Sequence, residues 1–352
     1  MKVYFYHTQD THYIYNEWSA GRFPSHLLYG ACELPEEGVE VIMHRHTDPR
    51  LPRWRRMLDV ARKVLFCREH FDAVYATKQN GLDLIILLRS VGLFRKPVVL
   101  WHHQPIEPRR GWLRRLIARQ YLRGIDHMFM FSEHIVQVSA GTGLVPAAKL
   151  QQCPWGADLD FYDRLMASHP TAHSGFISTG KELRDMPTLI EAFRQCPGQR
   201  LDIVAPADRN GSAYEQELHE ADAADNISVC INRTMWIPGI AERIWPHKAV
   251  CICCRESNYT VGLTTLVEAL AFGMPVIVSR NENHPFDAEA QGCGICVPYG
   301  DVAGWQAAIR RLDGDAAAYA AMCGKSRRLA EQTYNIRNCA RVVAEALRRL
   351  KR

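Results

Sequence analysis

The chain has 352 residues, 47% of them hydrophobic, and a formal net charge of +5. This length fits two domains of about 150 to 200 residues better than a single core. No run approaches the roughly 18 apolar residues that span a bilayer, and residues 1–7 lack the pattern of a secretory signal, so we expect a cytoplasmic protein.

The charge is uneven along the chain. Residues 1–150 carry 21 Lys and Arg against 14 Asp and Glu, whereas residues 151–352 carry 22 against 24. The first half shows no nucleic-acid-binding module. Its basic character therefore fits peripheral contact with the inner face of an anionic membrane better than it fits binding to nucleic acid.

Short apolar runs alternate with helical patterns through the first half. The runs predict strands over residues 3–6, 39–43, 73–76, 98–101 and 127–131. Helices are predicted between them, over residues 23–32, 54–67, 82–91 and 113–121. This alternation predicts a parallel sheet with helices on both faces.

A predicted loop over residues 7–24 is rich in Tyr, Trp and polar side chains. Such side chains can hold a sugar ring by stacking and hydrogen bonds. His12, Tyr13 and Arg22 are therefore candidate acceptor-binding residues. The alternative is a surface loop with a few buried aromatic side chains.

Two basic stretches, residues 50–63 and 109–123, mix Trp, Leu and Arg at helical spacing. Helices in a membrane interface have this composition, and so do helices that pack on a sheet with their arginines outside. Both interpretations are open on the sequence.

Two histidines, His102 and His103, follow the predicted strand at residues 98–101. Open parallel sheets bind ligands at the carboxyl ends of their strands, so both are candidates for ligand contact. A histidine in such a place is more often structural.

The second half repeats the alternation, with strands predicted over residues 175–178, 201–205, 227–231, 250–253, 276–279 and 294–297. A loop after the first of them carries Gly180, Lys181 and Arg184. The glycine permits a sharp turn, and the two cations can then neutralise the charge on a departing nucleoside diphosphate. The alternative is a solvated charge cluster that caps a helix.

Residues 249–279 predict a strand, a turn at Gly262, a helix over residues 264–271 and another strand. The unpaired N–H groups of the helix N-terminus, from Val261 to Thr265, favour an anion such as a diphosphate. Glu268 lies one helical turn further on, where a carboxylate can accept hydrogen bonds from two ribose hydroxyls. An ordinary helix residue is the alternative on this segment alone.

The 12 cysteines include two pairs with Cys-x-x-Cys spacing, Cys251/Cys254 and Cys293/Cys296. The first pair falls in a predicted strand, and the two pairs are too far apart for a zinc ribbon. We expect reduced thiols and no metal site.

The segment from Glu256 to Ser279 resembles the donor-binding segment of retaining glycosyltransferases of family 4. In that family, two glutamates separated by seven residues precede Ala-x-Ala-x-Gly-x-Pro-Val-Ile; Glu268 matches the second glutamate, and Thr260 replaces the first. The loop around Lys181 resembles the family's Gly-Arg … Lys donor loop, and residues 153–161 resemble its Pro-x-Gly-x-Asp-x-x-x-Phe segment.

The resemblance implies an α/β protein with the GT-B fold, in which two Rossmann-like doubly wound parallel-sheet domains face an interdomain cleft. It implies an N-terminal acceptor-binding domain over residues 1–155, with the C-terminal helix at about 334–352 packed back on it. A C-terminal domain over residues 156–333 would bind the nucleotide-sugar donor.

The resemblance also implies roles for particular residues, among them a sugar contact by Thr260 or Glu256 in place of the missing glutamate. The candidate catalytic residues are His103, Lys181, Arg184 and Thr260. The candidate donor-binding residues are Gly180, Glu256, Val261, Gly262, Leu263, Thr264, Thr265, Glu268 and Arg233, and His102 joins His12, Tyr13 and Arg22 as acceptor-binding candidates.

We therefore expect a retaining, metal-independent glycosyltransferase of the hexosyltransferase kind, with a nucleotide diphosphate sugar as donor and no cofactor. The acceptor would be a hydroxyl of a saccharide or of a lipid-linked glycan. Two alternatives stay open: a nucleotide-sugar epimerase with the GT-B fold, and a non-catalytic partner subunit that binds a nucleotide sugar.

Overall fold

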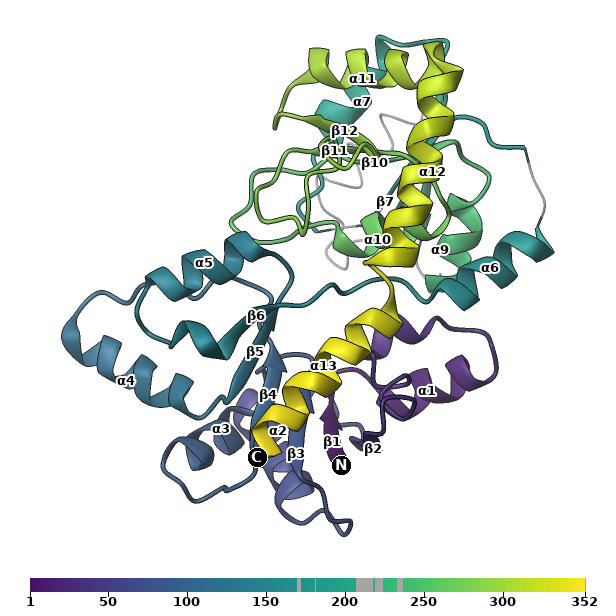
Figure 1. Cartoon of the computed structure of the whole chain (residues 1–352). Coiled ribbons are helices and arrows are strands. Elements are labelled where there is room, and N and C mark those ends of the chain that lie inside the picture. The colour runs from purple at the N-terminus through teal and green to yellow at the C-terminus, as the bar shows by residue number, and fades with distance from the viewer. Residues whose placement is uncertain (170–171, 181, 207–217, 219–223, 233–236, 352) are drawn as a thin grey trace. The chain divides into compact units, whose positions relative to one another are not determined.

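Two compact units make up the chain in the computed structural model, which describes all residues except 170–171, 181, 207–217, 219–223, 233–236 and 352 (Figure 1). The first unit comprises Met1–Trp155 together with Ile336–Arg352, and the second comprises Gly156–Asn335. Each is a parallel sheet flanked by helices.

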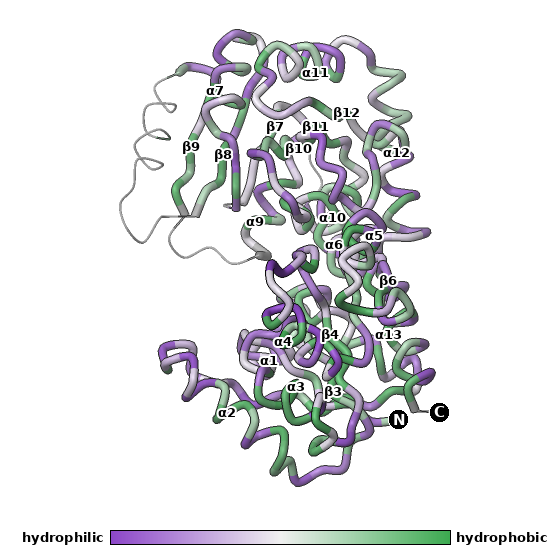
Figure 2. The backbone as a smooth tube through the Cα atoms, turned by 90° about the vertical axis from the view of Figure 1, so that its left-hand side faces the viewer, coloured by the Kyte–Doolittle hydropathy of each residue, from purple (hydrophilic) through white to green (hydrophobic). Residues whose placement is uncertain are grey.

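The first unit contains a six-stranded parallel sheet in the order β2-β1-β3-β4-β5-β6. Its strands are β1 (Lys2–Tyr6), β2 (Glu40–Met43), β3 (Ala73–Ala76), β4 (Val98–Trp101), β5 (His127–Met130) and β6 (Leu150–Gln152). Strands β3 and β4 are fully buried, as their continuous apolar sequences predict, and they are hydrophobic in Figure 2. Strand β2 lies on one side of β1, and β3 to β6 follow on the other side. The carboxyl ends of β1 and β3 therefore form the topological switch point, where open α/β sheets bind ligands.

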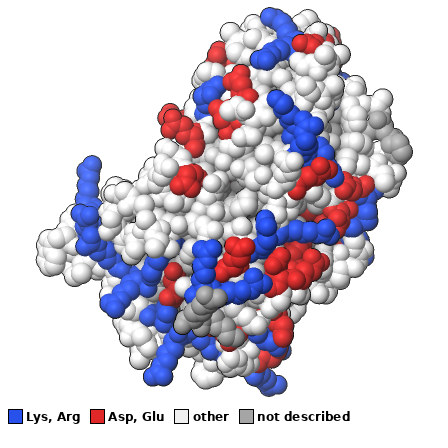
Figure 3. All heavy atoms as spheres, viewed as in Figure 1, with Lys and Arg blue, Asp and Glu red and all other residues white. Residues whose placement is uncertain are grey.

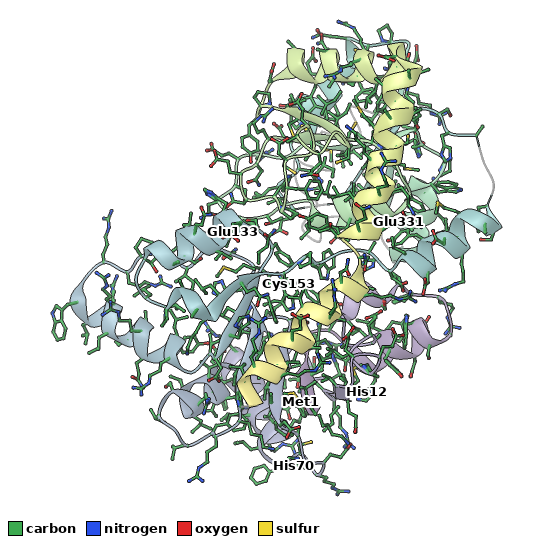
Figure 4. The ribbon with its side chains drawn as sticks, viewed as in Figure 1. Met1, His12, His70, Glu133, Cys153 and Glu331 are labelled. Carbon is green, nitrogen blue, oxygen red and sulfur yellow. The ribbon has the colours of Figure 1, made fainter. Side chains whose placement is uncertain are left out.

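The helices of the first unit are α1 (Thr11–Ser19), α2 (Arg53–Leu65), α3 (Asp83–Ser90), α4 (Trp112–Arg123), α5 (Glu133–Gly141) and α13 (Ile336–Lys351), with 3-10 turns η1 (Ser25–Leu28) and η2 (Ala147–Lys149). The last helix therefore belongs to the unit that contains the N-terminus. Cys153, labelled in Figure 4, lies beside α13, with its Sγ 3.8 Å from Sγ of Cys339.

Two local predictions for this unit are wrong, and one strand was missed. The loop predicted over residues 7–24 contains helix α1, because the Asp10 carboxylate accepts hydrogen bonds from the backbone N–H groups of His12 and Tyr13 and so caps the helix. The helix predicted over residues 23–32 is only the turn η1, which ends at Tyr29 in the left-handed region with φ of 52°. Strand β6 was not predicted, because its sequence Leu-Gln-Gln has no apolar run.

The second unit contains a six-stranded parallel sheet in the order β12-β11-β10-β7-β8-β9. Its strands are β7 (Phe176–Thr179), β8 (Leu201–Pro206), β9 (Ile227–Asn232), β10 (Ala249–Ile252), β11 (Val276–Ser279) and β12 (Gly294–Val297), close to the predicted ranges. The helices with described bounds are α6 (Leu159–Ser168), α7 (Met186–Arg194), α9 (Ile237–Ile244), α10 (Leu263–Ala271), α11 (Val302–Gly314) and α12 (Ala316–Gln332). Strands β7 to β9 extend to one edge and β10 to β12 to the other, so the switch point of this sheet lies between β7 and β10.

Candidate active site

Two loops meet at the switch point of the second unit. One connects β7 to α7, and the other connects β10 to α10. Arg184 of the first loop forms an isolated antiparallel bridge with Cys254 of the second, and the Tyr259 hydroxyl donates to the Glu182 carboxylate at 2.8 Å. The predicted donor loop and the predicted phosphate turn are therefore neighbours.

Arg184 is the central cation of this site and is only 5% exposed. Its Nε donates to the Thr179 carbonyl at 2.9 Å, and its Nη1 lies 3.2 Å from the Glu182 carbonyl and 3.3 Å from Sγ of Cys254. Its Nη2 lies 3.4 Å from Oγ1 of Thr265. All these partners are uncharged, and within the described part of the chain Arg184 forms no ion pair.

Two glycines approach this guanidinium with backbone conformations that other residues rarely adopt. Gly180 has φ of 97° and Gly262 has φ of 80°. A Cβ on Gly180 would lie 2.5 Å from Nη2 of Arg184, and a Cβ on Gly262 would lie 2.5 Å from a methyl group of Ile252. Both positions therefore require glycine.

Helix α10 begins next to Arg184, after Gly262, and no side chain of the described residues caps it. The first N–H with an intrahelical acceptor is that of Leu266, which donates to the Gly262 carbonyl at 3.0 Å. The N–H groups of Leu263, Thr264 and Thr265 consequently lack intrahelical partners. Together with the Arg184 guanidinium, this helix N-terminus has the donors and the charge that bind a phosphate group.

Thr260 and Glu256 lie on the same loop but differ in their surroundings. The Thr260 hydroxyl donates to the Asn283 carbonyl at 2.5 Å, so its proton is already engaged and its oxygen can only accept a further bond. Glu256 is exposed. Whether either replaces the sugar contact of the missing glutamate stays a prediction.

His284 also borders this turn and was not identified from the sequence. Its Nε2 lies 2.8 Å from the Val261 carbonyl; a carbonyl can only accept, so Nε2 carries the hydrogen and Nδ1 is an acceptor. Burial lowers the pKa of His284, and the charge of Arg184 lowers it further. Its position after the predicted strand at residues 276–279 was the only sequence feature that indicated a site residue, and no motif marked it.

Glu268 is 3% exposed and lies on the buried side of α10. The Tyr162 hydroxyl donates to its Oε1 at 3.0 Å, and burial raises the pKa of this carboxyl to about 8. The sequence interpretation assumed a charged carboxylate, whereas the structure favours a protonated carboxyl at neutral pH. Tyr162 was missed because it lies on α6, far away in the sequence.

Two predicted site residues, Lys181 and Arg233, lie outside the described residues. Their roles as catalytic and donor-binding residues stay predictions.

The first unit brings a second set of predicted residues to the carboxyl ends of its strands. Nε2 of His103, after β4, lies 2.8 Å from the Thr77 carbonyl after β3, so Nε2 is the donor and Nδ1 is an acceptor. Burial lowers the pKa of His103 to about 4, which makes the ring neutral at pH 7. His102 is bound to the Gln104 carbonyl through Nδ1 at 2.6 Å.

Two residues near His103 were missed. The Tyr29 ring is stacked 6.0 Å from the His103 ring and lies 6.0 Å from the ring of His7, which follows β1. Burial lowers the pKa of His7 to about 3. A neutral histidine thus stands on each side of a tyrosine, close to the switch point between β1 and β3.

The structure does not bring the four predicted acceptor-binding residues together. His12 lines a cavity of about 880 Å³ beside β2, and His102 lines a separate cavity of about 980 Å³ beside α4; the two cavities share no residue. Tyr13 packs edge-on against Phe23, and the Arg22 guanidinium is engaged by both oxygens of Glu17 at 2.6 and 2.7 Å. Helix α1 points the neighbouring side chains of His12 and Tyr13 in different directions, whereas Arg22 follows the end of that helix and His102 follows β4.

Within the described ranges, no group of three or more His, Cys, Asp or Glu side chains is placed to hold a metal ion. All 12 cysteines are free thiols.

No protein-family model and no curated protein matches the sequence. Solved structures do resemble it. HepE from Anabaena in complex with UDP aligns with a TM-score of 0.68 and 17% identity, over 99% of this chain and 100% of that chain. A glycosyltransferase from Rickettsia africae aligns with a TM-score of 0.68 and 12% identity, over 99% and 98%.

A UDP-forming α,α-trehalose-phosphate synthase from Burkholderia xenovorans, in complex with glucose-6-phosphate, aligns with a TM-score of 0.65 and 12% identity, over 84% of this chain and 77% of that chain. These alignments, and the two six-stranded parallel sheets, decide the fold class. The chain has the GT-B fold. At these identities, the likeness concerns the fold of the chain.

Proposed function

We propose that this GT-B protein is a glycosyltransferase that binds a nucleotide diphosphate sugar in its second unit and transfers the sugar to a hydroxyl group. The observation that carries the proposal is the buried Arg184 guanidinium, which has only uncharged partners among the described residues. A buried cation without a counter-ion is costly, and a bound diphosphate would supply the missing negative charge.

The surroundings of Arg184 suit a diphosphate in three ways. Gly180 and Gly262 leave no side chain between the loop backbones and the cation. The N-terminus of α10 offers N–H donors. A protonated Glu268 would not repel the phosphates, and a carboxyl group can both donate to and accept from ribose hydroxyls.

We propose a uridine nucleotide as the donor. HepE is described in complexes with UDP and with UDP-glucose, and the trehalose-phosphate synthase is UDP-forming. UDP-glucose is therefore the first donor to test.

The proposed reaction is that of a retaining, metal-independent enzyme of family 4. The bond between the anomeric carbon and the diphosphate oxygen breaks, and the acceptor oxygen forms its bond on the same face of the sugar. The acceptor proton passes to the departing diphosphate oxygen. Arg184 and the α10 N-terminus would stabilise the charge that this oxygen gains, and Lys181 would add a second cation. Neutral His103, whose Nε2 donates to the Thr77 carbonyl, would accept a hydrogen bond from a sugar hydroxyl at Nδ1 and so orient it.

The proposed acceptor is a hydroxyl of a saccharide or of a lipid-linked glycan. The neutral histidines His7 and His103 and the Tyr29 ring offer polar and aromatic contacts of the kind that bind sugars.

Calorimetric titration with UDP tests the donor site. Charge-assisted hydrogen bonds contribute about 1.5 to 3 kcal/mol, so we expect Arg184→Gln to weaken UDP binding by roughly 10- to 100-fold. Arg310→Gln, the same change on the exposed surface of α11 in the same unit, should leave the affinity unchanged. Equal affinities for wild type and Arg184→Gln would refute the assignment.

A second candidate function is supported by Thr260. The family's first glutamate is absent, and the hydroxyl that stands in its place has its proton engaged by Asn283. A protein that binds the nucleotide sugar without transferring it would fit this arrangement. Release of UDP from UDP-glucose, assayed with and without saccharide acceptors, separates the possibilities: acceptor-dependent release indicates a transferase, release of free sugar products alone an epimerase, and tight binding without release a binding subunit.

A further inference from the structure

Helix α4 exposes the face that a helix of a globular domain normally buries. Trp112 is 78% exposed, and Leu113, Leu116 and Ile117 are each more than half exposed. At 100° per residue, these four side chains occupy one continuous sector of the helix. Ala118 and Leu122, on the opposite side, pack against the core. The bulky apolar residues therefore point away from the protein.

The exposed surface continues onto helix α3 and the turn after it. Leu87, Val91 and Leu93 are exposed there, and Nε2 of Gln120 in α4 donates to the Ser90 carbonyl at 3.0 Å. Leu87, Leu116 and Ile117 line one cavity, so the two helices contribute to a single surface. We call the exposed side chains Leu87, Val91, Leu93, Trp112, Leu113, Leu116 and Ile117 the α3–α4 apolar face. Surfaces of this kind are contact sites more often than not.

Positive charge surrounds this face. Residues 109–123 contain six arginines and no Asp or Glu. Arg115 and Arg119 donate to the carbonyls of Thr142 and Gly143, which leaves their charge uncompensated, and in the described part of the molecule none of the six forms an ion pair. Figure 3 shows basic side chains beside uncharged surface on the lobe where Figure 1 places α4.

The other basic helix, α2, differs. It buries Val60, Ala61 and Val64, and its Lys63 and Arg62 both pair with Asp59 of the same helix. Helix α2 also exposes apolar side chains, with Trp54, Leu58 and Leu65 between 45% and 56% exposed, but Arg53 is compensated as well, because it pairs with Asp83. The difference between the two helices is therefore the compensation of charge, which makes α2 less suited than α4 to a negatively charged surface.

The cavity beside the α3–α4 apolar face has a volume of about 980 Å³. Besides Leu116 and Ile117 it is lined by His102 and Gln104, which follow β4. The exposed face of α4 is therefore continuous with a hollow that reaches the strand ends where the acceptor side of the proposed reaction lies.

We propose that the α3–α4 apolar face docks on the surface of an anionic lipid bilayer. The apolar sector would enter the acyl boundary, and the flanking arginines would contact anionic headgroups. A bilayer fits better than a protein partner. The apolar sector that includes Trp112 is complementary to the acyl chains, and the uncompensated arginines at its border are complementary to the plane of anionic headgroups beside them. Among the described helices, none is long and apolar enough to cross a bilayer, so the contact would be peripheral.

Vesicle flotation tests the docking surface on the full chain. Wild type should float with phosphatidylglycerol-containing vesicles and not with pure phosphatidylcholine, and added salt should weaken binding. Trp112→Glu should reduce partitioning at least about tenfold. Phe66→Glu is a matched control, because Phe66 follows α2 and is also 78% exposed; it should bind like wild type.

Two further variants test the mechanism. Removing two flanking charges with Arg110→Gln and Arg114→Gln should reduce partitioning about 30-fold at low salt. Brominated lipids should quench part of the wild-type tryptophan fluorescence, and Trp112→Phe should abolish that part while retaining vesicle binding.

The proposal is overturned if wild type does not float with anionic vesicles, or if Trp112→Glu and Phe66→Glu lose binding equally. Titration of each variant with UDP keeps this result separate from the proposed function, since the donor-site residues lie in the second unit. Unchanged UDP affinity with lost flotation supports docking by α4. Flotation without any UDP affinity would instead refute only the transferase assignment.

Discussion

Replacement of Glu268 by glutamine should stabilise the protein relative to wild type at high pH and leave its stability nearly unchanged at low pH. Burial raises the pKa of Glu268 from its ordinary value of 4.5 to about 8 in the folded protein. The folded state therefore holds the proton more tightly than the unfolded state, and the wild type loses stability as the pH rises from 4.5 towards 8. Below pH 4.5 Glu268 does not lower the stability of the folded state, and above pH 8 the loss of stability is complete.

The size of the effect follows from the two pKa values. Each pKa unit corresponds to about 1.4 kcal/mol, so ionising Glu268 in the folded state costs on the order of 5 kcal/mol. Glutamine has nearly the same shape, stays neutral and still offers an oxygen to the Tyr162 hydroxyl. Glu268→Gln should therefore be close to wild type at pH 5 and more stable by several kcal/mol at pH 9.

The measurement is the difference in free energy of unfolding between variant and wild type, from denaturant titrations at several pH values, because other titrating groups cancel in the difference. Glu242→Gln is the same change at an exposed position of α9, and its difference in free energy of unfolding from wild type should stay small at every pH. A Glu268→Gln difference that is equally flat from pH 5 to pH 9 would show that the buried carboxyl is not held protonated, and the account of Glu268 would fail.

Three further predictions concern single side chains. Gly262→Ala should destabilise the protein by about 2 kcal/mol or more, because φ is 80° and a Cβ would clash, whereas Gly198→Ala, in open space, should stay within about 1 kcal/mol in the same unfolding assay. Tyr162→Phe leaves the Glu268 carboxyl without its donor and should cost about 1 to 3 kcal/mol; an unchanged unfolding midpoint would argue against this hydrogen bond. The His103 ring, with its pKa lowered to about 4, should show no change in NMR chemical shift between pH 5.5 and pH 8, and its contribution to stability should be lost only as the pH falls from 6.5 towards 4.

Much of the fold could be predicted because its strands are marked locally. The runs at residues 73–76 and 98–101 became β3 and β4 with the same bounds, since a strand buried on both faces must be apolar throughout. The turn at Gly262 and the helix after it could also be predicted, because a glycine followed by a helical pattern is a feature of neighbouring residues. The alternation of such elements indicated two parallel sheets.

The candidate site could be predicted only in part, because its chemistry depends on residues brought together by sheet order. The sequence by itself determined the strands with apolar runs, the glycine turn before the helix at residues 264–271, and the presence of Arg184 and Glu268. Only the tertiary structure decided that Tyr162 would bind Glu268, that burial would keep this carboxyl protonated, and that His284 would support the turn. Likewise α2 and α4 have similar basic patterns and both expose apolar side chains, but only the tertiary structure decided that Arg53 of α2 pairs with Asp83 of α3. Periodicity assigns a residue to one face of a helix, and it does not show which residues that face contacts.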